Sequence, residues 1–342
     1  MSANTDFDTG RLDAWLERHV EGARGELKLA RIPGGQSNPT YFVDKGALRM
    51  VLRKQPAGDI LPSAHAVDRE YRIMSALAAT AAPVPRVLAF HAERDVLGTP
   101  FYLMERLEGR VFHDNALPGL SREDRRAAYL SMAETLARLH SVDFAAIGLG
   151  DYGRPGNYFQ RQIARWSSQY DLARTEHIEA MERLKQWLPE NIPPGDETRI
   201  NHGDYRLGNF LSRADGTLAA VLDWELCTLG DVLADVGYLL NNWAEEGEPL
   251  PPGALDFPPT TAGGFPTRAE ITARYAERTG FDVSMVQYYR AFSSWRLAAI
   301  NEGVKRRYME GVMVDDSFPL ESYDERVEAL ATTALELLRG VA

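Results

Sequence analysis

The β-strand patterns of this sequence fall almost entirely before residue 106, and helical patterns dominate the remainder. Within residues 27–56, short runs such as "TYFV" and "RMVLR" are separated by turn-forming residues, which predicts an antiparallel sheet. "PVPRVLAF" and "TPFYLMERLEG" predict two further strands. Apolar residues at helical spacing predict a helix over residues 10–22 and another over "AVDREYRIMSALAAT". The first part of the chain therefore predicts a small sheet accompanied by helices.

The rest of the chain predicts a larger helical region that holds a single hairpin. The hairpin is expected within residues 209–223, with "ADG" at its tip, and the proline-rich residues 247–266 predict a loop. A chain of 342 residues is too long for one small core. We therefore expect an α+β fold of two lobes, residues 1–106 and residues 107–342. Helical spacing in the second lobe covers residues from about 120 to 142, residues 157–188 and most of residues 268–340.

The composition is that of an ordinary globular chain, with 44% hydrophobic and 25% charged residues. The sequence contains no apolar run near the length of a membrane span, and the start "MSANTDFDTG" lacks a leader pattern, so we expect a cytoplasmic protein with no membrane partner. The formal net charge of −11 argues against a nucleic-acid partner. The single cysteine, Cys227, excludes an internal disulfide and is expected to be inert. The sequence does not decide between a monomer and a homodimer.

Acidic and amide side chains gather in two stretches beside apolar strands, "NHGDYRLGN" and "VLDWE". Asp204 and Asn209 are separated by four residues, and Asp223 ends the next predicted strand. Carboxylate and amide oxygens suit Mg²⁺, which binds one or two protein groups together with phosphate oxygens and water. Asp204 would then remain to accept a proton from an attacking hydroxyl. Two interpretations stay open for Glu225, a further carboxylate near the metal or an exposed residue at a strand end.

The two stretches resemble the paired signature of the aminoglycoside phosphotransferase family, whose members are relatives of the protein kinases. The closer similarity is to the kinase-like domain of acyl-CoA dehydrogenase fusion proteins. The resemblance implies a protein-kinase-like bilobal fold that binds ATP, or GTP, and Mg²⁺ between the lobes. The supporting strings follow the family's order over roughly residues 28–240: "GGQSNPTYFV", "VLRKQP", "DREYRIMSAL", "PVPRVLAF", "GTPFYLMERLEGRVF", "LARLH", "NHGDYRLGNFL" and "VLDWELCTLGDVLADVGY".

The resemblance also implies roles for individual residues. Asp204 would be the catalytic base or the group that orients the acceptor hydroxyl, and Asn209 and Asp223 would hold the Mg²⁺. Asp235, in "LADVGY", would brace the catalytic loop. His202 is expected to shape this loop through hydrogen bonds rather than to shuttle protons.

The nucleotide-binding end departs from the kinase pattern. "PGGQSNPT" is neither a G-x-G-x-x-G loop nor a Walker loop, although its glycines would let backbone N–H groups approach phosphate oxygens. In "MVLR", Arg53 stands where the family usually has lysine, and Lys54 should point to the opposite face of the strand. We favour Arg53 as the phosphate contact, with Glu70 as its partner, and the backbone of Glu105 and Leu107 would hold adenine. The expected nucleotide-binding residues are thus Gly34, Gly35, Gln36, Ser37, Asn38, Arg53, Glu70, Glu105 and Leu107.

The acceptor is expected to be a small molecule with a hydroxyl group, bound by the helical lobe. A polycationic aminoglycoside would need a pocket lined by carboxylates, whereas two stretches of this lobe mix aromatic and basic residues. We therefore favour a hydroxylated metabolite, such as a hydroxy acid or a hydroxyacyl-CoA, and the resemblance to the fusion proteins points the same way. Aminoglycoside O-phosphotransferase activity and a nucleotide-binding pseudokinase or regulatory module are the alternatives. A metal-dependent hydrolase is disfavoured because the other six histidines are scattered. The candidate acceptor residues include Tyr158, Arg161, Arg165, Trp166, Arg290, Trp295, Arg296, Lys305, Arg306 and Arg307.

Overall fold

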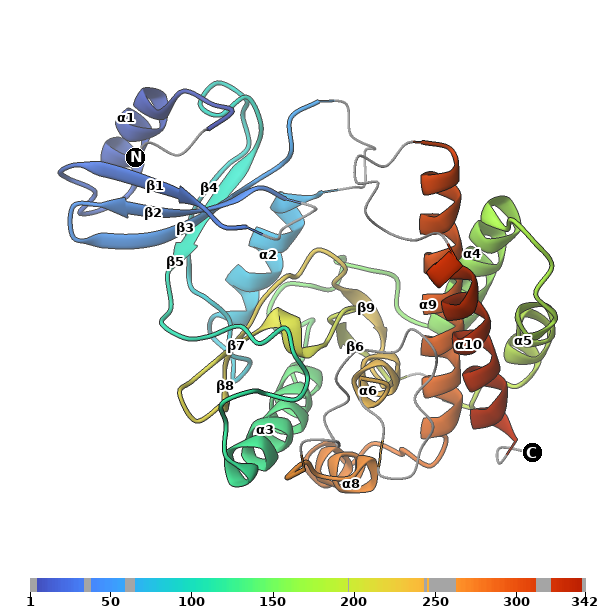
Figure 1. Cartoon of the computed structure of the whole chain (residues 1–342). Helices are drawn as coiled ribbons and strands as arrows, with labels where there is room; N and C mark the ends of the chain where they lie inside the picture. The colour runs from blue at the N-terminus through green and yellow to red at the C-terminus, as the bar shows by residue number, and fades with distance from the viewer. Residues whose placement is uncertain are drawn as a thin grey trace.

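The computed structural model folds the chain into a smaller N-terminal lobe and a larger, mainly helical lobe (Figure 1). This architecture confirms the predicted α+β fold. The first predicted helix and the strands before residue 106 are all present. The structure describes residues 5–33, 38–58, 65–195, 197–242, 245, 263–311 and 321–339.

A five-stranded antiparallel sheet forms the smaller lobe, with the strands in the order β1-β2-β3-β5-β4. Alternation along β2 buries Tyr41 and Val43 on one face, as expected for a sheet with one covered side. The strand β5 ends at Glu105, where the chain leaves the sheet for the larger lobe. The strands are β1 (Leu27–Arg31), β2 (Thr40–Lys45), β3 (Leu48–Lys54), β4 (Val87–His91) and β5 (Phe101–Glu105).

Two helices accompany this sheet and belong to different cores. Helix α1 (Thr9–His19) buries Leu12, Trp15 and Leu16 in a cluster with residues of the sheet. Helix α2 (Val67–Leu77) instead contributes its apolar residues to the large core that continues into the second lobe. Since α2 is shared in this way, Glu70, on its buried side, lies at the junction of the two lobes.

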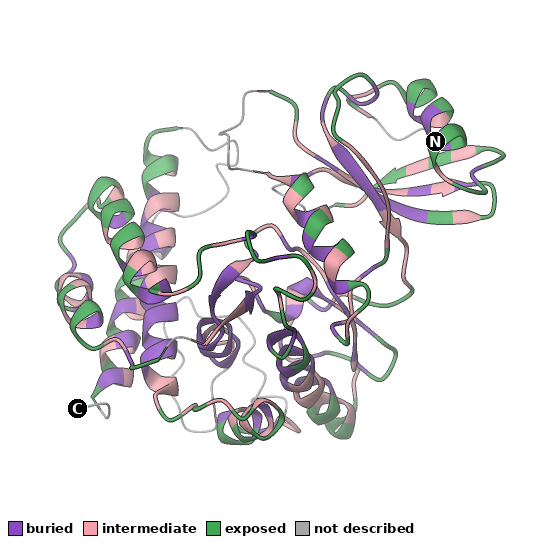
Figure 2. Cartoon of the chain, turned by 180° about the vertical axis from the view of Figure 1, so that it is seen from behind, coloured by how far each residue is buried: buried purple, intermediate pink, exposed green. Residues whose placement is uncertain are grey.

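The larger lobe is built around the 24-residue helix α9 (Val286–Met309). Helix α6 (Leu233–Leu240) packs so closely against α9 that a Cβ atom on Gly237 would lie 2.4 Å from the carbonyl carbon of Tyr289. The central helices of this lobe are mostly buried, while outer helices expose one side (Figure 2). The remaining helices are α3 (Arg122–His140), α4 (Tyr158–Ala173), α5 (Glu179–Glu190), α8 (Arg268–Thr279) and α10 (Glu321–Leu338).

Two short two-stranded sheets lie in the larger lobe. The two strands of one sheet lie, in the sequence, between the two strands of the other. The predicted hairpin is confirmed as β7 (Phe210–Ser212) paired with β8 (Leu218–Val221). The expectation that this hairpin would hold the only strands of the lobe was wrong, because β6 (Thr198–Asn201) also pairs with β9 (Thr228–Asp231). These four-residue strands are too short to show a readable alternation, and they pair across the whole hairpin.

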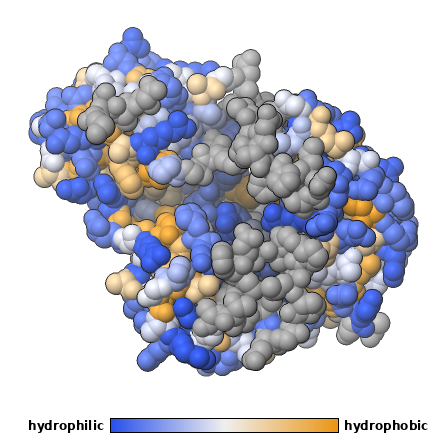
Figure 3. All heavy atoms as spheres, viewed as in Figure 1, coloured by the Kyte–Doolittle hydropathy of each residue, from blue (hydrophilic) through white to orange (hydrophobic). Residues whose placement is uncertain are grey.

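Among the coloured residues of the face seen in Figure 3, most are hydrophilic, and apolar residues lie between them. Within the part of the chain that the structure describes, no helix combines the length and apolar character needed to cross a membrane.

Candidate active site

Asp204 lies in the loop that leads from β6 to the short 3₁₀ turn Leu207–Asn209. Its carboxylate accepts three hydrogen bonds from side chains. The hydroxyl of Tyr238 donates to Oδ1 at 2.7 Å, Nδ2 of Asn209 donates to Oδ2 at 2.7 Å, and Nε of Arg206 donates to Oδ2 at 3.3 Å. The side chain keeps 25% of its surface exposed. The carboxylate is therefore fixed in orientation and still open to a ligand.

The backbone of this loop is held by Asp235 from the first turn of α6. Its carboxylate accepts the N–H of His202 at 2.6 Å and the N–H of Gly203 at 2.9 Å, and Nε2 of His140 lies 3.4 Å from it. Burial alone would raise the pKa of Asp235, but His140 and the backbone donors hold that pKa below its ordinary value. The predicted bracing contact between Asp235 and the loop is thus present in the structure.

His202 is buried and makes two hydrogen bonds through its ring. Nε2 lies 3.0 Å from the carbonyl oxygen of Leu222, and Nδ1 accepts the N–H of Asp204 at 3.3 Å. Because a carbonyl oxygen only accepts, the ring proton lies on Nε2. The ring also packs edge-on against Trp224, at 4.8 Å between centroids. His202 therefore links the two predicted motifs, in agreement with its expected structural role.

Asp223 follows β8 in a left-handed conformation, with φ of 61°, which aspartate tolerates better than most residues. The N–H of Leu222 donates to the carbonyl oxygen of Asn209 at 2.8 Å, so the two predicted metal ligands lie on neighbouring segments. Oδ1 of Asp223 is 3.0 Å and Oε2 of Glu225 is 3.6 Å from Nη2 of Arg53. Glu225 therefore faces this site from the loop between β8 and β9, and the alternative of an exposed strand-end residue was wrong.

Arg53 connects the smaller lobe to these carboxylates and to α2. Its Nε lies 2.9 Å from Oε2 of Glu70. The same carboxylate accepts a hydrogen bond from Nδ2 of Asn38 on Oε1 at 2.8 Å and one from the hydroxyl of Tyr102 on Oε2 at 3.1 Å. Burial alone would lower the pKa of Arg53, but the negative charges of Glu70 and Asp223 raise that pKa above its ordinary value. The guanidinium therefore stays charged where phosphate oxygens are expected.

Lys54 points to the opposite face of β3, as strand alternation predicted. Its Nζ lies 2.7 Å from Oδ2 of Asp6 and 5.7 Å from the ring centroid of Phe7. Arg53, and not Lys54, thus faces the lobe junction.

The oxygen atoms of Asn209 and Asp223 fit a Mg²⁺ ion whose other ligands are oxygen atoms of the substrate and of water. Among the described residues, no three His, Cys, Asp or Glu side chains gather in a cluster that could hold a metal by themselves. Nδ2 of Asn209 donates to the carbonyl oxygen and to the carboxylate of Asp204, so Oδ1 of Asn209 is the atom that could bind a cation. Two protein oxygens with substrate oxygens and water would complete the coordination that Mg²⁺ prefers.

The predicted adenine contacts lie where β5 leaves the sheet. The N–H of Glu105 already donates to the carbonyl oxygen of Arg86 at 2.9 Å, so this N–H is not available to a base. Leu107 follows in the connecting segment, and no hydrogen bond from its N–H to another described residue is formed. The other predicted phosphate contacts, Gly34, Gly35, Gln36 and Ser37, fall outside the described residues, as does most of the loop 247–266.

Several of the candidate acceptor residues pair or pack within the fold. Trp295 is fully buried, Nε of Arg290 donates to Asn241 at 3.0 Å, and Nζ of Lys305 lies 3.1 Å from Glu176. Sequence spacing cannot distinguish a basic residue paired inside a helical bundle from one that faces a ligand.

Cationic and apolar groups border the loop that carries Asp204. Nη2 of Arg296 donates to the carbonyl oxygen of Gly203 at 3.2 Å, while Arg206 contacts Asp204 itself. Leu226 is 57% exposed, and a Cβ atom on Gly203 would lie 2.7 Å from its carbonyl oxygen. An exposed leucine and two guanidinium groups therefore lie beside the loop that carries Asp204.

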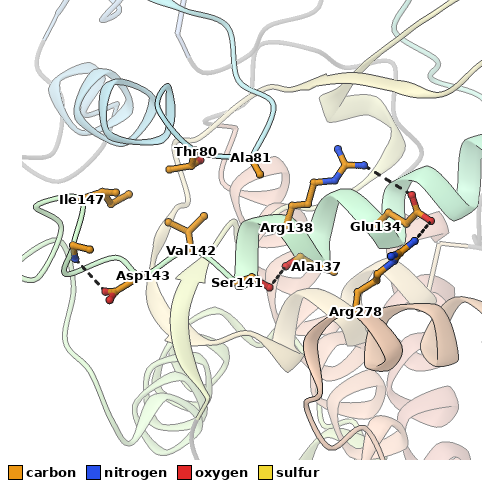
Figure 4. Close-up of a pocket in the computed structure, with 11 residues that line it drawn as sticks. Thr80, Ala81, Glu134, Ala137, Arg138, Ser141, Val142, Asp143, Ile147 and Arg278 are labelled. Atoms are coloured by element: carbon orange, nitrogen blue, oxygen red, sulfur yellow. Dashed lines mark hydrogen bonds and ion pairs between the residues drawn. The ribbon is translucent and has the colours of Figure 1, made fainter.

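A separate hollow of about 570 Å³ lies between residues 80–81 and the C-terminal part of α3 (Figure 4). None of the residues discussed above lines it. Its charged lining consists of two acidic and two basic side chains, Glu134, Asp143, Arg138 and Arg278, so their formal charges cancel. Without excess positive charge, this hollow is a poor site for nucleotide phosphates.

Sequence reasoning missed Tyr238, Arg206 and Tyr102. Tyr238 lies three residues after Asp235, so both share one side of α6. Tyr102 is paired with Arg53 across β3 and β5, and this register was not readable before the sheet order was known. Arg206 stands inside the quoted motif, where only the carboxylate and amide positions drew attention.

Comparison with known proteins identifies relatives over most of the chain. The family model described as the phosphotransferase enzyme family matches residues 28–257. Acyl-CoA dehydrogenase family member 11 of Mus musculus is 38% identical over 341 residues, which is 97% of this chain and 43% of that protein. Acyl-CoA dehydrogenase family member 10 of Mus musculus is 42% identical over 304 residues, 86% of this chain and 28% of that protein. This chain thus spans less than half the length of these curated relatives.

Solved structures share the fold. A Ralstonia eutropha protein assigned to the aminoglycoside phosphotransferases has 40% identity and a TM-score of 0.85, covering 97% of this chain and 98% of that one. The spectinomycin phosphotransferase bound to ADP and spectinomycin has 12% identity and a TM-score of 0.60, covering 96% and 98% of the two chains. At such low identity the second likeness concerns the fold alone.

Proposed function

The chain belongs to the phosphotransferase enzyme family, and from this premise we propose that it moves the γ-phosphoryl group of ATP to the hydroxyl group of a small molecule. The observation that supports this most directly is the set of contacts around Asp204. Asn209 and Tyr238 orient its carboxylate, and the backbone of Asn209 is bonded to the residue before Asp223. This arrangement supports Asp204 as the base and Asn209 and Asp223 as the metal-binding residues, beside the cationic Arg53.

In the proposed reaction, the acceptor oxygen forms a bond to the γ-phosphorus as the bond to the bridging oxygen breaks. ADP leaves with that electron pair, and Asp204 accepts the hydroxyl proton. Arg53 would bind phosphate oxygens, and Asn209 and Asp223 would hold Mg²⁺. When bound, the metal supplies positive charge that offsets negative charge on the phosphoryl oxygens. The protein's own contribution is therefore mainly positioning and charge neutralisation.

We propose a hydroxylated metabolite, such as a hydroxy acid or a hydroxyacyl-CoA, as the acceptor. Arg206 and Arg296 place positive charge next to Asp204, and the exposed Leu226 adds apolar surface. The carboxylates of Asp223 and Glu225, on the segment after β8, are paired with Arg53. A polycationic aminoglycoside would meet repulsion here, whereas an anionic or acyl-bearing molecule would find complementary groups.

A Mg²⁺-dependent ADP-release assay tests this proposal. ATP or GTP would be combined in turn with hydroxy acids, hydroxyacyl-CoAs and aminoglycosides. Asp204→Asn should abolish turnover and keep nucleotide binding, because the amide cannot accept the proton. Asp215→Asn, at the exposed tip of the β7–β8 hairpin, is the matched control and should retain full activity.

The outcomes separate the alternatives. Turnover with an aminoglycoside alone would reject the proposed acceptor class. Nucleotide binding without turnover on any acceptor, unchanged in Asp204→Asn, would favour the pseudokinase alternative.

A further inference from the structure

The carboxylate of Asp204 is almost fully occupied by the protein itself. A carboxylate offers about four lone-pair sites to donors. Tyr238 takes one on Oδ1, Asn209 takes one on Oδ2, and Nε of Arg206 lies 3.3 Å from both oxygens. About one site is left for an acceptor hydroxyl. A hydroxyl that binds Oδ1 must share this oxygen with Tyr238, which therefore limits the direction of its approach.

That partner, Tyr238, is itself held in place from two elements. It stands on α6, one turn after Asp235, which fixes the backbone of the same loop. From α9, the guanidinium of Arg296 lies 5.4 Å from the centroid of its ring. Burial and the charge of Asp204 raise the pKa of Tyr238 above its ordinary value, so the phenol keeps its proton and remains a donor.

The hydroxyl of Tyr238 makes no hydrogen bond that holds the backbone of the described residues. Its one hydrogen bond among the described residues is the bond to Asp204, at 2.7 Å. The backbone of the loop is held independently by the carboxylate of Asp235. Removing this hydroxyl should therefore change the orientation of the Asp204 carboxylate and leave the backbone of the loop unchanged.

We propose that Tyr238 is a positioning residue, which fixes Oδ1 of Asp204 so that one acceptor hydroxyl, and not water, is aligned for phosphoryl transfer. This inference rests on the proposed function and assigns a residue that directs the base without contacting the reacting atoms. Loss of the Tyr238 hydroxyl opens a second site on Oδ1, to which water or a misaligned hydroxyl can bind.

The test compares Tyr238→Phe with Tyr205→Phe. Tyr205 is the next residue to Asp204 in the loop, and its hydroxyl donates to the carbonyl oxygen of Met132 at 2.9 Å instead of to a carboxylate. Both variants lose one phenolic hydroxyl. A hydrogen bond to a charged group is worth enough that its loss should lower kcat of Tyr238→Phe by about 10- to 100-fold. The affinity for Mg·ATP should not change, and the ADP released per acceptor phosphorylated should rise.

These readouts distinguish positioning from a packing role. Equal kcat losses in the two variants, or a loss of Mg·ATP affinity in Tyr238→Phe, would overturn the inference. So would an unchanged ratio of ADP to phosphorylated product.

A second measurement keeps the inference testable if the wild-type protein phosphorylates no acceptor, a result that would defeat the proposed function alone. Nδ2 of Asn209 donates to the carboxylate that Tyr238 holds, so the side-chain amide resonances of Asn209 report the orientation of Asp204. These resonances should shift in Tyr238→Phe and stay in place in Tyr205→Phe. Resonances that are unmoved in both variants would show that Tyr238 does not fix the carboxylate.

Discussion

Arg53→Met should destabilise the protein, because the buried carboxylate of Glu70 would lose its counter-ion. The side chain of Glu70 is 1% exposed and that of Arg53 is 13% exposed, so their ion pair lies in the protein interior. Removing one partner of a buried ion pair costs about 3–5 kcal/mol, because the remaining charge is left without its counter-ion. Asn38 and Tyr102 still donate to Glu70 in the variant. We therefore expect a loss near the lower limit, about 3 kcal/mol in the free energy of unfolding by urea.

The same substitution should weaken nucleotide binding for a different reason. A hydrogen bond between charged groups contributes about 1.5–3 kcal/mol, so the affinity for Mg·ATP should fall about 10- to 100-fold. The double variant Arg53→Met, Glu70→Gln separates the two effects. Its neutral glutamine needs no counter-ion, so most of the lost stability should return while the nucleotide affinity stays low. Titration calorimetry measures the second quantity.

Two results would refute this reasoning. A double variant as unstable as Arg53→Met would show that the stranded charge of Glu70 is not the cause of the instability. An unchanged dissociation constant for Mg·ATP in Arg53→Met would show that Arg53 does not contact the phosphates.

Two further substitutions test the scaffold of the loop. The pKa of Asp235 is lowered from 3.8, so its contribution to stability is present above that value and is lost as the pH falls through the lower folded pKa. The difference in unfolding free energy between wild type and Asp235→Asn should therefore shrink below about pH 4, and a difference independent of pH would contradict this. Gly237→Ala should cost about 1–3 kcal/mol or more, because its Cβ would meet the backbone of Tyr289 at 2.4 Å. Gly303→Ala, on α9 with nothing within 4 Å, is the control and should be neutral or stabilising in the same thermal melts.

The sequence was sufficient for the parts of the fold that depend on local periodicity. Strands β2 to β5 and the long helices carry alternation or helical spacing over enough residues to be recognised. The pair β6–β9 was missed because each strand has four residues, and their pairing depends on the segment between them. Nothing local distinguishes Thr198–Asn201 from a loop.

The residues of the candidate site also fall into those that the sequence indicates and those that only the structure shows. Asp204, Asn209 and Asp223 could be named because their chemistry is written in contiguous motifs. The contact between Tyr238 and Asp204 joins residues 34 positions apart and arises only when α6 packs beside the loop. Such contacts are set by tertiary packing, which a sequence pattern does not encode locally.

The carboxylates of Asp223 and Glu225 both pair with the guanidinium of Arg53. These ion pairs affect how a divalent ion and a nucleotide would bind at this site. A divalent ion that arrives alone must compete with a guanidinium that cannot diffuse away. Phosphate oxygens would draw the guanidinium toward themselves and release the same carboxylates for the ion. By thermodynamic linkage, each ligand would then strengthen the binding of the other by the same factor. The junction of the lobes would thus select the metal–nucleotide complex over either component.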